Sequence, residues 1–155
     1  MTLQTSVVSP FPLEPTLDTL RRDHAVQLSL CDDLEVVADR LPILPSRTTV
    51  ESLCECIELL AHRHYRRAEH AFSRLPRDRQ PTDTAAADIT AMHQLDEMHG
   101  EDLASALRAS LDDPANANVG QLAYMLRCYF DGLRRAIALK ESWMTHIERD
   151  LVKAG

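Results

Sequence analysis

The chain has 155 residues, a formal net charge of −7 and only four glycines. This composition favours a single all-α domain, and the acidic balance argues against non-specific nucleic-acid binding. No apolar run approaches the ~20 residues of a membrane-spanning helix, and the four cysteines lack the spacing of a zinc site or a disulfide scaffold. We therefore expect a cytoplasmic protein with reduced thiols. Residues 1–15 are expected to form a tail without signal-peptide character, followed by a domain over residues 16–155.

Four amphipathic segments follow in chain order, each with apolar residues at helical spacing. They cover about 17–41, 48–75, 84–111 and 118–151. Each start carries side chains that can cap a helix: Thr16, Thr48 with Glu51, Thr82 or Asp83, and Asn118 with Gln121. Because long helices joined by short links pack against their chain neighbours, the segments predict an all-α, up-down-up-down antiparallel four-helix bundle.

Three of these helices are predicted to place a histidine on the apolar stripe. His64 has apolar residues three to four positions away on both sides, and His24 and His99 hold similar places. A buried imidazole needs a partner, because an unpaired buried polar group costs about 1–3 kcal/mol. His24 and His64 lie roughly 17 and 16 residues from the link between their helices, so antiparallel packing puts them at similar heights. The match for His99 is coarser.

Two interpretations of these histidines stay open at this point. Three inward imidazoles near one level predict a metal site in the core of the bundle. Alternatively, they form a polar core cluster in which the imidazoles bond to Tyr129, Asp96 or Asp102. The other histidines fall off the stripes and are predicted to be solvated: His62, His70, His93 and His146.

Four stretches of the sequence resemble the hemerythrin-like (HHE cation-binding) domains. They are DHAVQLSLCDDLEVVADRLP, HRHYRRAEHAFSRL, LDEMHGEDLASAL and LRRAIALKESW, and the resemblance covers about residues 17–151. Members of this family are four-helix bundles that typically hold a non-haem di-iron centre through histidines and bridging carboxylates. They serve oxygen binding, iron handling, or redox and nitric-oxide sensing. The resemblance implies His24, His64 and His99 as iron ligands, and dioxygen or nitric oxide as the small ligand.

The sequence also departs from the pattern of this family. In the second helix, the first of two expected glutamates is Ala68, and only Glu69 remains. In the fourth helix, the expected histidine is Ala136 and the first glutamate is Lys140, followed by Glu141. An ammonium at a cation site repels a metal, and it could supply the charge that a missing metal no longer provides.

These departures leave two hypotheses. The first is a hemerythrin-like protein that binds one or two irons through the three histidines, with further candidate ligands at Glu69, Asp102 and Glu141. The second is a metal-free interaction or regulatory module in which Lys140 occupies the lost site. The sequence contains no recognisable nucleophile–base pair or phosphate-binding loop, so we do not expect an enzyme. The apolar pairs Leu59/Leu60 and Trp143/Met144 leave room for a homodimer contact.

Overall fold

The computed structural model describes residues 16–153, apart from the side chains of residues 60–61. The described part consists of α1 (Leu17–Arg40), α2 (Arg47–Ser73), α3 (Asp83–Asp112) and α4 (Val119–Lys153), with short 3-10 turns Arg77–Arg79 and Pro114–Asn116 in two links. This confirms the predicted all-α chain of four helices. The predicted tail lies outside the described residues. No helix in the described part is both long and apolar enough to cross a membrane.

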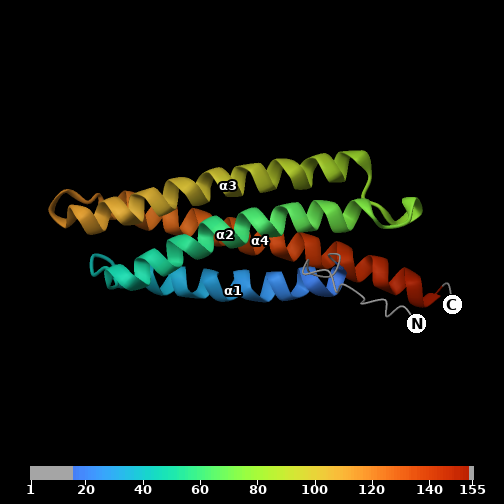
Figure 1. Cartoon of the computed structure of the whole chain (residues 1–155), viewed down its shortest axis with the longest axis horizontal. Coiled ribbons are helices and arrows are strands. Elements are labelled where there is room, and N and C mark those ends of the chain that lie inside the picture. Colours follow the sequence, from blue (N-terminus) through green and yellow to red (C-terminus); the bar gives the residue numbers. More distant parts are fainter. Residues whose placement is uncertain (1–15, 154–155) are drawn as a thin grey trace, which may run out of the picture.

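The helices pack so that α1 and α3 each contact both α2 and α4. In Figure 1, the α1–α2 and α3–α4 links lie at one end of the molecule, and the α2–α3 link lies at the other. The ion pairs between α1 and α4 run in opposite sequence order along the two helices: Arg21–Glu148, Glu35–Arg134 and Asp39–Arg127.

Side-chain caps fix where the helices begin. The hydroxyls of Thr16 and Thr82 and the side-chain oxygen of Asn118 each accept a backbone N–H three residues on, as predicted. The predicted cap at Thr48 is wrong, because α2 begins earlier. Ser46 caps α2 instead, with its Oγ 3.3 Å from the backbone nitrogen of Thr49.

The core contains two apolar clusters that a polar layer separates. One cluster surrounds Leu34, Ile57, Leu107 and Phe130, and the other surrounds Leu20, Ala68, Phe72 and Met144. Between them along the chain, each helix contributes buried polar side chains: His24 and Gln27, His64, His93 and Asp96, and Lys140. The polar layer therefore crosses all four helices.

The predicted inward face of α3 is wrong by a small rotation of the helix. His99 is exposed, as are Leu95 and Met98, which are 49% and 51% accessible. The buried residues of α3 are Ile89, His93, Asp96, Gly100, Leu103, Ala104, Leu107 and Ser110. The predicted and the observed inward faces share Ile89 near one end of α3 and Leu103 and Leu107 near the other. Between these ends the apolar pattern favoured Met92 and Leu95. The folded chain instead buries a histidine and an aspartate there.

Candidate functional site

The polar layer is centred on the amine of Lys140, which comes from α4 and is 1% exposed. Its Nζ lies 3.0 Å from Nε2 of His64 on α2 and 3.3 Å from Nε2 of His93 on α3. Because an ammonium has only donors, it donates to both rings, and each ring accepts as a neutral imidazole. The ring of His24, on α1, packs edge-on against His64 with centroids 4.8 Å apart.

A carboxylate lies behind each of the three imidazoles. Glu141 is 2.5 Å from Nδ1 of His24, Asp23 is 3.3 Å from Nδ1 of His64, and Glu69 is 3.0 Å from Nδ1 of His93. Each ring donates its Nδ1–H to the carboxylate, which leaves the Nε2 lone pair as an acceptor. Proteins use the same carboxylate–imidazole arrangement to orient histidines that bind metals. Here the acceptors of two rings face an ammonium.

Two arginines at the edge of the molecule hold the outer carboxylates. Nη1 of Arg67 lies 2.9 Å from Asp23, and Nε of Arg21 lies 3.5 Å from Glu141. Both arginines are partly exposed, so each pair adds little stability by itself. Their effect is to fix the carboxylates, which in turn fix the tautomers of His64 and His24.

The electrostatics of the layer follow from one buried cation. Burial lowers the pKa of Lys140 to about 8, and the negative charges of Asp96, Asp23 and Glu141 oppose this change. Burial, followed by the charge of Lys140, lowers the pKa of His93 to about 4 and lowers the pKa of His64 further. At neutral pH the centre is therefore a charged amine that donates to uncharged imidazoles.

Several buried polar atoms around this centre have no hydrogen-bond partner within the described residues. They are Nε2 of His24, both side-chain amide atoms of Gln27, Oδ2 of Asp96 and the hydroxyls of Tyr65 and Tyr129. The predicted hydrogen bonds from the imidazoles to Tyr129, Asp96 or Asp102 are therefore not the ones that form. The rings bond instead to Asp23, Glu69 and Glu141.

The structure brings together some of the predicted site residues and separates others. His24 and His64 lie in the centre, and Glu69 and Glu141 adjoin it through Nδ1 atoms rather than facing it. His99 and Asp102 are exposed, and they line a surface pocket of about 230 Å³ with Tyr124, Met125, Cys128 and Tyr129. His93 was predicted to be solvated, yet it is 2% exposed. Counting back from Leu107 and Leu103 by three and four residues reaches Gly100, Asp96 and His93. This spacing is the feature of the sequence that indicates a buried His93.

The arrangement of these side chains does not fit a metal cation. Within the described part of the chain, no group of three or more His, Cys, Asp or Glu side chains is arranged to hold a metal ion. Three of the carboxylates around the centre, Glu141, Asp23 and Glu69, are bound to Nδ1 atoms. The ammonium of Lys140 lies between the acceptors of His64 and His93. A second positive charge at this place would be repelled.

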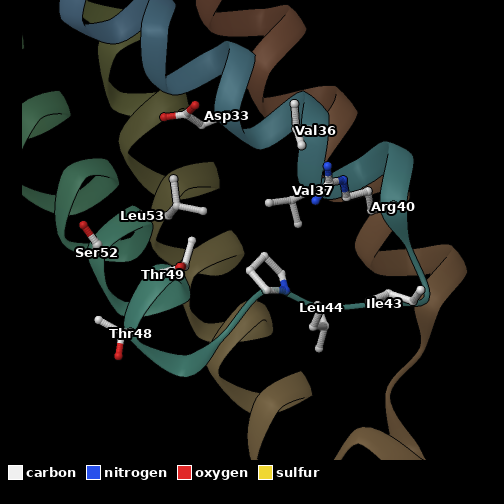
Figure 2. A pocket seen from close by; sticks show the side chains of 11 residues that line it. Asp33, Val36, Val37, Arg40, Ile43, Leu44, Thr48, Thr49, Ser52 and Leu53 are labelled. Atoms are coloured by element: carbon white, nitrogen blue, oxygen red, sulfur yellow. The ribbon is translucent and has the colours of Figure 1, made fainter.

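A separate groove of about 660 Å³ lies where α1 ends and α2 begins. Figure 2 shows apolar side chains around it, among them Val37, Leu44 and Leu53. Asp33, Val36 and Arg40 line it from α1, and hydroxyl groups line it from α2. Ile43, in the link, is 75% exposed at its edge. The groove therefore combines apolar walls with one acid and one base.

Comparison with known proteins adds no relative, since no family model, no curated protein and no solved structure matches the chain. The resemblance to hemerythrin-like domains stays a prediction from the sequence.

Proposed function

We propose that the protein is a metal-free interaction or regulatory module with the up-down-up-down bundle of hemerythrin-like domains. In this proposal the ammonium of Lys140 takes the place that the family gives to a metal cation. The observation that carries it is the position of Nζ, 3.0 Å and 3.3 Å from the Nε2 atoms of His64 and His93. The order of the α1–α4 ion pairs along the two helices supports the antiparallel arrangement.

The hydrogen bonds explain why a lysine suits this position. Two rings whose Nδ1–H groups are bound to carboxylates leave buried acceptors that need a donor. An ammonium supplies three N–H groups and one positive charge, and Asp96 and Glu141 lie close enough to stabilise that charge. The chain therefore keeps its polar layer together with one of its own side chains.

A second candidate function is iron binding with dioxygen or nitric oxide as the small ligand. Nε2 of His24 favours it, because this buried atom has no partner among the described residues. In this candidate His93 takes the role that the sequence assigned to His99. The ammonium of Lys140 would have to leave the centre first, so the two candidates make opposite predictions about added metal.

Metal content decides between them. Elemental analysis of protein purified without chelator or nickel affinity should find no stoichiometric metal, and anaerobic addition of Fe²⁺ or Zn²⁺ should leave the Tm unchanged. The variant Lys140→Glu replaces the cation with a carboxylate, so it should gain metal binding and a metal-dependent rise in Tm. Lys153→Glu, at the exposed end of α4, makes the same charge change as a control.

The opposite result would establish the second candidate. One or two irons per wild-type chain, with a Tm increase that His64→Ala abolishes, would rule out the metal-free proposal. Failure of Lys140→Glu to bind metal, in a variant that folds by circular dichroism, would show that Lys140 is not what keeps a metal out.

A further inference from the structure

The outer face of α1 carries a stripe of exposed residues at alternating steps of three and four. The stripe consists of Val26, Ser29, Asp33, Val36, Arg40 and, just beyond the helix, Ile43. Its apolar members are 48%, 50% and 75% exposed. Spacing of this kind forms the seam along which two helices pack side by side. The stripe borders the groove between α1 and α2, which Asp33, Val36, Arg40 and Ile43 also line.

The two charged residues of the stripe, Asp33 and Arg40, differ in their ion pairing from the acidic residues on this half of α1. Asp32 and Glu35 pair with Arg134 on α4, and Asp39 pairs with Arg127. Across residues 16–153, in contrast, Asp33 and Arg40 form no ion pair with the described side chains. They are seven residues apart, which is two helical turns or about 10 Å, and Val36 lies between them.

We propose that this surface binds a second copy of the same chain, with the two α1 helices antiparallel about a two-fold axis near Val36. A two-fold axis there places Asp33 of each copy opposite Arg40 of the other, so the two unpaired charges form two equivalent ion pairs. A parallel, in-register arrangement would instead oppose Asp33 to Asp33 and Arg40 to Arg40. The charges therefore select the antiparallel arrangement.

The shape and apolar character of the surface suit this occupant. The groove lets the second α1 approach α2 as well, beside Thr48, Thr49 and Ser52. Ile43, the most exposed of the three apolar residues, lies past the end of the helix, so antiparallel packing directs it toward Ser29 of the second copy. Burial of these side chains drives association, and the ion pairs set the register.

This surface differs from the dimer contacts that the sequence suggested. Of those contacts, Met144 is fully buried and Trp143 packs edge-on against Phe72 with ring centroids 4.4 Å apart, whereas Leu59 on α2 is 54% exposed. The stripe contains none of the residues that contact Lys140, so the dimer does not rest on the metal-free centre. Either proposal can fail without the other.

Sedimentation equilibrium of the full chain tests the arrangement through charge reversal. The wild type should be a dimer, and Asp33→Arg or Arg40→Asp alone should raise the dimer Kd at least about tenfold, because each creates two like-charged contacts. The double variant Asp33→Arg/Arg40→Asp should restore the dimer. An equimolar mixture of the two single variants should form a heterodimer, since both of its contacts then join opposite charges.

Arg135→Asp is the matched control, because Arg135 is exposed on α4 and lies off the stripe. It should leave the wild-type Kd unchanged. A monomeric wild type at high micromolar concentration would overturn the proposal, as would a dimer that is indifferent to both single reversals. Loss of the dimer in the single variants without recovery in the double variant or the mixture would also overturn the antiparallel pairing.

Discussion

Lys140 is the residue on which the polar layer depends, and it acts through hydrogen bonds and through charge. As a donor it satisfies Nε2 of His64 and His93. As a cation it disfavours protonation of the same rings, since its charge is the largest contribution after burial to the lowered pKa of each. These effects reinforce each other, because only a neutral imidazole can accept the hydrogen bond. The lysine thus keeps its neighbours in the state in which they can bind it.

This coupling predicts the behaviour of Lys140→Met, which keeps a side chain of similar length without its charge. The pKa of His93, about 4 in the wild type, should rise by one unit or more, because the repelling cation is gone while Glu69 remains at Nδ1. A pH titration of the imidazole signals by NMR measures this directly. Lys153→Met, at the exposed end of α4, should leave the His93 titration unchanged. An unaltered titration in Lys140→Met would show that burial alone sets this pKa.

At the scale of the helices, the sequence predicted which segments are helical, and where they begin and end, better than it predicted which face of each helix points into the core. Prolines and capping side chains mark the helix ends, so the predicted ranges lie within a few residues of the observed ones. The inward positions of His24, His64 and Lys140 also follow from their stripes. The buried face of α3 did not follow from its stripe, because the apolar spacing favours Leu95 over Asp96 as the inward residue. The spacing back from Leu103 reaches His93 and Asp96, but what makes their burial favourable is the chemistry that the other helices provide.

Two glycines within helices, Gly100 and Gly132, differ in how closely other side chains approach them, and this difference gives two predictions. A Cβ at Gly100 would lie 2.9 Å from Cγ2 of Ile57 and 3.2 Å from the ring of Tyr129, and both neighbours are buried. Gly100→Ala should therefore destabilise the fold by about 1–2 kcal/mol, in spite of the higher helix propensity of alanine. A Cβ at Gly132 meets only Oδ1 of Asp96, at 3.9 Å. Gly132→Ala should stabilise the fold by about 0.5–1 kcal/mol.

Urea unfolding of the two alanine variants beside the wild type separates these effects. Equal stabilisation of both variants would mean that α2 and α4 yield readily around Gly100. The comparison isolates packing, because the two substitutions are chemically identical and both lie within long helices.

At the scale of the whole molecule, two apolar clusters stabilise a layer that is costly by itself. The layer buries a charged amine, an aspartate and several polar atoms without partners among the described residues, and such groups destabilise a fold unless they are paired. Lowering the pKa of Lys140 from 10.5 to about 8 corresponds to about 3 kcal/mol of destabilisation at neutral pH. The apolar packing on both sides has to exceed this cost. A fold that keeps such a layer is expected to respond to pH.

In the alkaline range the stability of the fold is expected to rise with pH, whereas a lysine whose pKa is raised by a salt bridge would make it fall. Between pH 8 and 10.5 the unfolded chain binds the Lys140 proton while the folded chain has released it, so stability should rise with pH by about 2 kcal/mol from pH 7 to 9.5. Burial raises the pKa of Tyr65 and Tyr129, which opposes the rise above pH 10 and limits the useful range. On the acid side, stability should fall from pH 6.5 toward 4, because His93 gains its proton more readily when unfolded.

Urea unfolding of the wild type and of Lys140→Met at pH 7, 8.5 and 9.5 measures the alkaline part. All other groups titrate alike in the two proteins except the imidazoles near the substitution, and these are already neutral throughout this range. The difference in unfolding free energy between the two proteins therefore reports Lys140 itself, and it should change by about 2 kcal/mol in favour of the wild type as the pH rises. A difference that stays constant with pH would mean that the Lys140 amine keeps its ordinary pKa in the fold. In that case an ammonium with enough solvation to remain charged, rather than one confined between two imidazoles, would occupy the centre of the bundle.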